Sequence, residues 1–123
     1  MRDADGNWRY PRPEVETGWH ISRTDNRAMI GQCGLLPADP FVGNQHGVYF
    51  YTGSFAHAAG IIADMTREDA ADGSVHGYDL WQADLRSLPV FQDELIAGES
   101  VFTPEPVAPS RLTLLEHGGR RDG

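Results

Sequence analysis

Hydrophobic positions along the chain follow two different periods, which predict helices in the first half and mostly strands in the second. The stretch GWHIS (18–22) alternates as a strand does, and GVYFYT (47–52) has the β-branched and aromatic content of another. VHGYDLWQADL (75–85), ESVFT (99–103) and RLTLLE (111–116) suit further strands, and the prolines between them forbid a continuous helix. The pattern therefore predicts a domain of the α+β class.

Two helices are expected, each after one of the first two strands. Ser22, Thr24 or Asp25 can cap the first helix, and its apolar face would consist of Ala28, Met29, Ile30 and Cys33. Gly34 can supply the left-handed residue that ends it. Ser54 can cap the second helix, whose buried stripe has helical spacing: Phe55, Ala58, Ala59, Ile62 and Met65. Small residues at 58–60 would let this helix approach the sheet, and the polar stretch 68–74 would form the loop after it.

The ends of the chain show neither the helical nor the strand period of hydrophobic residues. They are expected to lie outside the packed domain. Residues 1–17 are polar and contain prolines, which indicates an extended N-terminal arm, with Trp8 and Tyr10 available to pin it. Residues 18–117 are enough for one domain with a modest core. Residues 118–123 are expected to form a flexible C-terminal tail.

Composition narrows the classes of function. The formal net charge is −8, so the molecule as a whole repels nucleic acid and anionic membrane surfaces. Cys33 is the only cysteine, which excludes an internal disulfide and a cysteine-based zinc site. No metal-ligand spacing links the other histidines, His46, His57, His76 and His117, so no metal site is predicted. Because no apolar run could span a bilayer and the N-terminus lacks a signal-peptide core, a soluble, cytoplasmic protein without a membrane partner is expected.

Several short motifs follow one another in a characteristic order: WHIS (19–22), a helix ending in GLLP (34–37), GVYFYTGSFAHAAG (47–60), YDLWQADL (78–85) and ESVFTPEPVAPSRL (99–112). Over residues 18–116, this order and spacing resemble the ADP-ribosyltransferase superfamily of the His-Tyr-Glu type. The resemblance implies an α+β, ADP-ribosyltransferase-like split β-sandwich with two short helices. In that family, NAD lies in a cleft between two small sheets.

The resemblance also implies roles for individual residues. His20 matches the histidine that holds the adenosine-side ribose of NAD, and Tyr49 matches the tyrosine that helps to hold the nicotinamide end. Glu99 matches the catalytic glutamate at the start of a late strand, which binds the ribose of the nicotinamide nucleotide. NAD, as co-substrate, would contact residues of the first two motifs: His20, Ile21, Ser22, Tyr49, Phe50 and Tyr51.

These residue types suit the cleavage of NAD. Breaking the bond between ribose and nicotinamide develops positive charge on the sugar, as in glycoside cleavage. A carboxylate such as Glu99 would stabilise that charge and accept a proton from the incoming nucleophile. Tyr49 or Tyr51 could stack on the flat nicotinamide ring, and a neutral histidine suits a ribose diol because it donates one hydrogen bond and accepts another. Arg23 or Arg27 could meet the diphosphate.

The chain departs from the family pattern at three places. Ile21 stands where the family has a glycine after the histidine, and residues 58–60 stand where many members carry a second aromatic residue, a role that Tyr51 or Phe55 could take. Ala97, two residues before Glu99, stands where arginine-modifying members have Glu or Gln. A second frame, QDE (92–94), would make Glu94 the catalytic carboxylate with Gln92 as its partner.

The sequence therefore predicts an NAD-dependent mono-ADP-ribosyltransferase that moves ADP-ribose to an acceptor and releases nicotinamide. The acceptor, whether a protein, a nucleic acid or a small molecule, is left open, and loops 38–47 and 66–74 would choose it. One alternative is a non-catalytic module that binds a partner or nucleotide in the same cleft, favoured by the missing glycine and second aromatic residue. Another is an NAD glycohydrolase, in which water is the acceptor.

Overall fold

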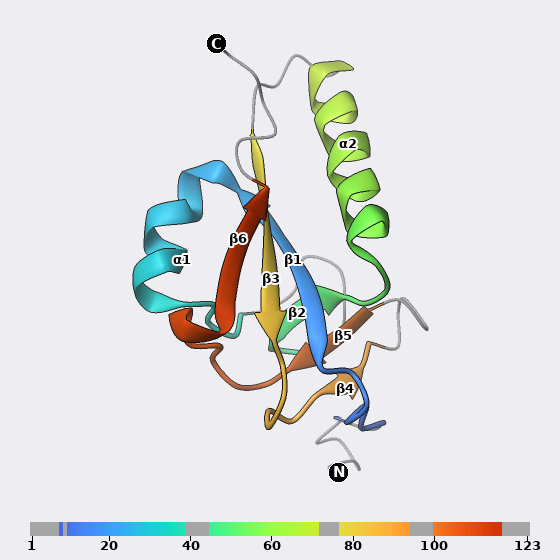
Figure 1. The fold of residues 1–123 in the computed structure, drawn as a ribbon, viewed down its shortest axis with the longest axis vertical. Helices are drawn as coiled ribbons and strands as arrows, with labels where there is room; N and C mark the ends of the chain where they lie inside the picture. The colour runs from blue at the N-terminus through green and yellow to red at the C-terminus, as the bar shows by residue number, and fades with distance from the viewer. Residues whose placement is uncertain (1–7, 9, 39–44, 72–76, 94–99, 117–123) are drawn as a thin grey trace.

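The computed structural model describes residues 8, 10–38, 45–71, 77–93 and 100–116. These residues form an α+β domain, as the sequence predicts (Figure 1). Its elements follow in the order β1 (Thr17–Arg23), η1 (Thr24–Asn26), α1 (Arg27–Cys33), β2 (Val48–Tyr51), α2 (Phe55–Ala71), β3 (Tyr78–Asp84), β4 (Phe91–Gln92), β5 (Ser100–Thr103), η2 (Pro109–Arg111) and β6 (Leu112–Glu116).

All six strands belong to one antiparallel sheet in the order β4-β5-β2-β1-β3-β6. β1 pairs with β3 along its whole length, from Thr17 opposite Asp84 to Arg23 opposite Tyr78. β1 and β2, by contrast, are in register at one residue pair, Trp19 and Tyr51. We therefore distinguish a β1 half-sheet (β1, β3, β6) from a β2 half-sheet (β2, β5, β4), whose strands run in a different direction in Figure 1. The two separate sheets that the resemblance implies are here the halves of one sheet.

Each face of the sheet carries its own hydrophobic cluster, because successive side chains of a strand point to opposite faces. On one face, Phe50, Trp81 and Val101 pack with Ile30 of α1. On the other face, Trp19, Tyr78 and Leu80 pack against α2, and Ala58 and Ile62 of that helix complete the cluster. The alternation of side chains along the central strands thus sets which face of the sheet each helix covers.

The first helix is short, as expected, but more of its apolar side chains are exposed than predicted. Of its expected apolar face, only Ile30 is buried, while Ala28, Met29 and Cys33 are exposed. Consecutive residues of a helix point about 100° apart, so Ala28, Met29 and Ile30 cannot all face the core. The expected side-chain cap is also wrong: a 3-10 turn precedes α1, and no side chain caps either element. Gly34 ends the helix as predicted, with a φ of 77°.

A buried ion pair replaces that cap. The carboxylate of Asp79 in β3 is completely buried and accepts hydrogen bonds from the Thr24 hydroxyl (2.8 Å) and the Arg27 guanidinium (2.8 and 3.0 Å). Thr24 is therefore engaged with the sheet rather than with the helix backbone. This bidentate contact fixes the start of α1 against β3.

The second helix agrees with the sequence at its start and in its buried stripe. The hydroxyl of Ser54 accepts a hydrogen bond from the backbone N–H of His57 (3.1 Å), as an N-cap does. Ala58 and Ile62 are buried and Met65 is partly buried, whereas Phe55 is 40% exposed and meets Trp19 edge-on.

The same helix differs from the sequence prediction in its length and at one glycine. It is seventeen residues long rather than short, and it continues to Ala71 through part of the expected polar loop, because an exposed helix face tolerates polar residues. Arg67, for example, pairs with Asp64 one turn earlier. Gly60 faces open space and plays no part in the approach of the helix to the sheet.

The described part of the N-terminal arm lies along β4, a two-residue strand that the sequence did not predict. The backbone N–H of Arg12 donates to the carbonyl of Val90 (2.7 Å), and that of Gln92 donates to the carbonyl of Tyr10 (2.8 Å). The arm therefore completes the outer edge of the β2 half-sheet. The tail 118–123 lies outside the described residues. Within the described part of the chain, no helix has both the length and the apolar character needed to cross a membrane.

A pair of glycine substitutions tests how closely the two half-sheets pack. A Cβ at Gly18 would lie 2.7 Å from Cβ of Phe50 and 2.9 Å from Leu85, both in the core, so Gly18→Ala should lower the free energy of unfolding by about 1–3 kcal/mol. Gly60→Ala, in open space on α2, should raise it by about 0.5–1 kcal/mol. Urea unfolding of both variants measures the difference, and equal stability of the two would contradict the packing described here.

Candidate functional site at the junction of the half-sheets

Two side chains of β1 reach across the junction where the backbone ladder stops. The indole N–H of Trp19 donates to the carbonyl of Gly53 (2.9 Å), and Nδ1 of His20 lies 3.0 Å from the carbonyl of Tyr49. Because neighbouring residues of a strand face opposite sides, these two contacts join the half-sheets on both faces. His20 and Tyr49, which the sequence singles out from separate motifs, are thereby brought together.

The partner of His20 fixes the tautomer of its neutral ring. A carbonyl oxygen can only accept, so Nδ1 carries the proton, and Nε2 of the neutral ring is an acceptor. Burial lowers the pKa of His20 below its ordinary value, although the hydrogen bond to Tyr49 opposes this shift. The ring meets Phe50 edge-on at 5.8 Å. Among the described residues nothing bonds to Nε2, which can therefore accept a hydrogen bond from a ligand hydroxyl.

Tyr49 is held at both its ring and its hydroxyl. Its ring stacks on Phe102 of β5, with ring centroids 5.2 Å apart and planes inclined by 24°. Its hydroxyl donates to the carbonyl of Gln45 (2.5 Å) and accepts from the backbone N–H of the same residue (3.1 Å). Gln45 is buried, with 7% of its surface exposed. No signal in the sequence marks Gln45, because its role depends on main-chain groups that any residue carries.

The remaining predicted binding residues lie on different faces. Phe50 is a core residue with 2% of its surface exposed, so its side chain supports His20 from beneath. The hydroxyl of Ser22, on the same face of β1 as His20, accepts a hydrogen bond from the indole of Trp81 (3.3 Å). Ile21 and Tyr51 pack, partly buried, against the cluster beneath α2. By the same alternation, the Tyr49 ring lies on the face of β2 opposite Phe50. Ile21, Tyr49 and Tyr51 can therefore share a site with the His20 ring only through their backbone groups.

Both candidate catalytic carboxylates, Glu99 and its alternative Glu94, lie outside the described residues. The residue after Glu99 in the sequence, Ser100, is buried and pairs with Tyr51 of β2.

Arg27, one of the arginines considered for the diphosphate, binds a carboxylate of the protein. Its guanidinium binds the buried Asp79 with two nitrogens, and 40% of its side chain is exposed. The signal for this contact was present in the sequence, because Asp79 is a charged residue within an apolar strand and such a carboxylate needs a partner.

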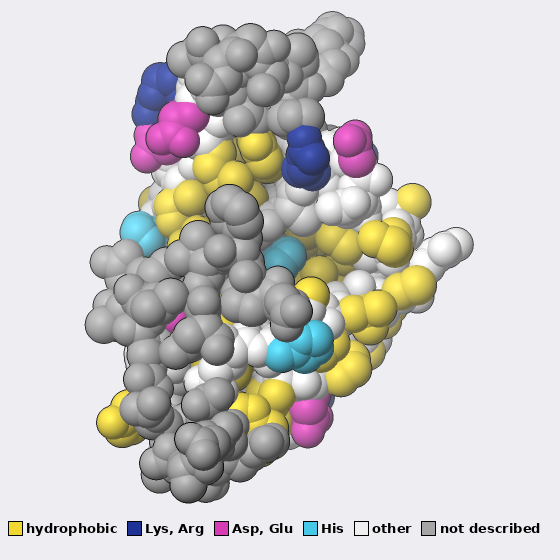
Figure 2. Space-filling model, turned by 180° about the vertical axis from the view of Figure 1, so that it is seen from behind, with side chains coloured by type: hydrophobic (Ala, Val, Ile, Leu, Met, Phe, Trp, Pro, Cys, Tyr) yellow, Lys and Arg dark blue, Asp and Glu magenta, His cyan; other side chains and the backbone are white. Residues whose placement is uncertain are grey.

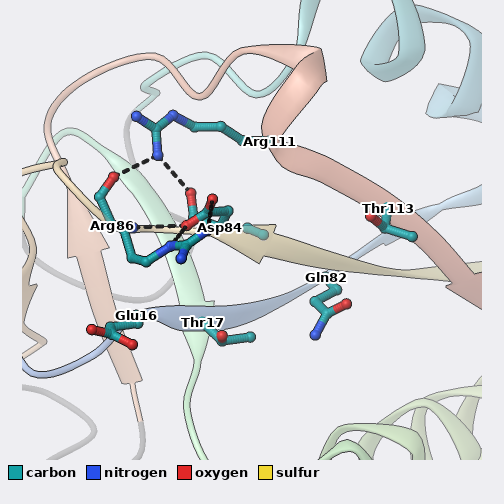
Figure 3. A pocket seen from close by; sticks show the side chains of 8 residues that line it. Glu16, Thr17, Gln82, Asp84, Arg86, Arg111 and Thr113 are labelled. Carbon is teal, nitrogen blue, oxygen red and sulfur yellow. Dashed lines mark hydrogen bonds and ion pairs between the residues drawn. The ribbon is translucent and has the colours of Figure 1, made fainter.

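A polar cavity of about 230 Å³ lies elsewhere, on the β1 half-sheet (Figure 3). It is lined by Glu16, Thr17, Gln82, Ala83, Asp84, Arg86, Arg111 and Thr113. Its arginines already have partners: Arg111 donates to the carbonyls of Asp84 (2.9 Å) and Arg86 (2.7 Å), and Arg86 binds the carboxylate of Asp84. The hydrogen bonds from Arg86 lower the pKa of Asp84 to about 2. These contacts fix the turn after β3.

The described side chains on one face of the molecule are of mixed character. On the face seen in Figure 2, histidine and hydrophobic side chains lie near one another, and charged side chains are scattered above, beside and below them. No group of three or more His, Cys, Asp or Glu residues in the described ranges could hold a metal ion.

Comparison with protein-family models, with curated proteins and with solved structures gave no match to this chain. The functional interpretation therefore rests on the residues and geometry of the chain itself.

The lowered pKa of His20 predicts a specific loss of stability in acid. In the unfolded chain, His20 takes up a proton near pH 6.5, whereas in the folded chain it does so at lower pH. The stability that the neutral ring contributes is therefore lost as the pH falls through this interval. His20→Asn keeps a donor for the Tyr49 carbonyl but does not titrate. Urea midpoints from about pH 7.5 to about pH 5 should fall more steeply for the wild type than for this variant. Parallel curves would mean that His20 titrates normally.

Proposed function

We propose that the protein is an NAD-dependent mono-ADP-ribosyltransferase. The observation that carries this proposal is the contact between Nδ1 of His20 and the carbonyl of Tyr49 at the junction of the half-sheets. It joins the His20 ring to the backbone of Tyr49, the two motif residues to which the resemblance gives the two ends of NAD, and the Tyr49 ring lies on the other face of β2. The strand order, with β1 and β2 adjacent in the centre of the sheet, supports the same interpretation.

The described residues fit the ribose of a dinucleotide. With its Nδ1 proton donated to Tyr49, the His20 ring offers Nε2 as an acceptor to a ribose hydroxyl, which is a donor. The lowered pKa keeps this acceptor unprotonated at neutral pH. The ring is also held against Phe50, so it is oriented before a ligand arrives. Tyr49, fixed through Phe102 and Gln45, would help to hold the nicotinamide end.

NAD supplies the ADP-ribosyl group, and nicotinamide is the leaving group. In this proposal, the carboxylate of Glu99 stabilises the positive charge that develops on the ribose and then accepts the proton of the nucleophile. His20 and Tyr49 bind and orient NAD in this proposal. Neither exchanges a proton with the reacting atoms.

The second candidate is a non-catalytic module that binds a nucleotide in the same place. Two observations favour it. Ile21 brings a side chain packed against the α2 cluster to a position where the family has a glycine, and Gly60, within the stretch aligned with the second aromatic residue, faces open space. The three candidate activities differ in the fate of bound NAD. A binding module releases no nicotinamide, a glycohydrolase releases it without an acceptor, and the transferase needs an acceptor.

Release of nicotinamide from NAD tests the catalytic role of Glu99. With a cell lysate as the source of acceptors, Glu99→Gln should slow release by about 10²–10⁴-fold, because it removes the charge and the proton acceptor but keeps the shape. Glu94→Gln measures the alternative frame, and Glu105→Gln, at an exposed position after β5, is the matched control. Equal release by Glu99→Gln and the wild type would contradict catalysis by Glu99. Release that needs no lysate would identify a glycohydrolase.

Measuring the affinity for NAD tests the binding site independently of catalysis. Calorimetry should show weaker binding to His20→Ala than to the wild type, by roughly tenfold, because a hydrogen bond to a ribose hydroxyl is lost. Glu99→Gln should still bind NAD. An affinity unchanged by His20→Ala would place NAD elsewhere and overturn the proposed site.

A further inference from the structure

The N-terminal arm contacts the candidate site through a residue that lies far from it in the sequence. The backbone N–H of Trp8 donates to the side-chain oxygen of Gln45 (2.8 Å), and Gln45 in turn holds the hydroxyl of Tyr49 with both of its main-chain groups. Gln45 is buried, so its side-chain oxygen needs a donor from the protein. A path of hydrogen bonds therefore runs from the arm to Tyr49.

A row of aromatic rings forms a second path between the same two residues. Trp8 stacks on Phe91 of β4 (centroids 5.4 Å apart, planes at 24°), Phe91 packs on Phe102 of β5 (5.9 Å), and Phe102 stacks on Tyr49 (5.2 Å). Because rings packed in this way resist tilting independently, the position of the Trp8 ring constrains the plane of the Tyr49 ring.

Trp8 adopts an unusual backbone conformation. Its φ is +35°, which L-residues other than glycine rarely adopt. Strain of this kind persists only where the surrounding contacts fix the residue, and it is found most often at functional sites. Here the hydrogen bond to Gln45 and the stack on Phe91 are among the contacts that fix it.

We infer that the arm is a positioning strap for the NAD site, with Trp8 and Gln45 as positioning residues. The strap holds the Tyr49 ring in the orientation that receives the nicotinamide end, and loosening it lowers the fraction of molecules that are ready to bind. This inference rests on the proposed function for its ligand, but the attachment of Tyr49 to the arm can be measured without NAD.

The test uses the full chain labelled with 3-fluorotyrosine. The chain has four tyrosines, so ¹⁹F NMR gives a small set of signals, and Tyr49→Phe identifies the one from Tyr49. Trp8→Ala removes the stacked ring but keeps the backbone N–H, and Gln45→Ala removes the side-chain acceptor but keeps the main-chain groups. Tyr10→Ala is the matched control, because that side chain lies on the same arm and is 55% exposed.

Trp8→Ala and Gln45→Ala should each shift or broaden the Tyr49 signal, whereas Tyr10→Ala should leave it unchanged. Each of the two should weaken NAD binding roughly fivefold, and Trp8→Phe should restore most of the affinity because it restores a stacked ring. In the release assay, these variants should raise KM and leave kcat nearly constant, a split that a general loss of folded protein would not give.

Two results would overturn the strap. One is a Tyr49 signal that is the same in Trp8→Ala as in the wild type; the other is a shifted signal with unchanged affinity for NAD. The proposed function fails in a different way: the wild type then neither binds NAD nor releases nicotinamide, while the dependence of the Tyr49 signal on Trp8 still shows that the arm positions this ring.

Discussion

The structure depends on a sheet that is nearly divided where β1 meets β2. The two strands are in register at a single pair, and side chains do what the backbone ladder does elsewhere: Trp19 and His20 each bond to a carbonyl of the segment from β2 to the start of α2. Gly18 lets Phe50 approach β1 more closely than a Cβ would permit. A junction with few backbone bonds leaves polar groups and ring edges at the centre of the sheet, which is where a ligand can be recognised without disrupting a continuous ladder.

The two half-sheets are stabilised in different ways. The β1 half-sheet has the long β1–β3 pairing and the buried Asp79, whose bonds to Thr24 and Arg27 fix the start of α1. The β2 half-sheet has short strands, and its outer edge is completed by the N-terminal arm and by the row of rings from Trp8 to Tyr49. Residues that hold this half together thus also orient Tyr49, so the stability of this half and the position of the Tyr49 ring are coupled. The β1 half-sheet provides His20 from a strand that is paired with β3 along its whole length.

His20 illustrates how one side chain serves structure and chemistry together. Its Nδ1 proton bonds to the carbonyl of Tyr49 at the junction, and its Nε2 lone pair has no partner among the described residues. The same burial that makes the bond effective lowers the pKa of the ring and keeps that lone pair unprotonated at neutral pH. A histidine that is satisfied structurally is therefore compatible with a binding role, because the two roles use different nitrogens.

The sequence by itself determined the local structure: the strands at β1, β2, β3, β5 and β6, the cap at Ser54, the stop at Gly34 and the burial of one residue among Tyr49, Phe50 and Tyr51. These follow from period, turn chemistry and alternation, which act over a few residues. Tertiary structure alone decided that Thr24 binds Asp79 rather than capping a helix, that Arg27 joins it there, and that β4 forms against the arm. It also decided that Gln45 holds Tyr49. Each of these depends on a partner distant in sequence, and the alternation that predicts two faces of a strand does not say which face meets which helix.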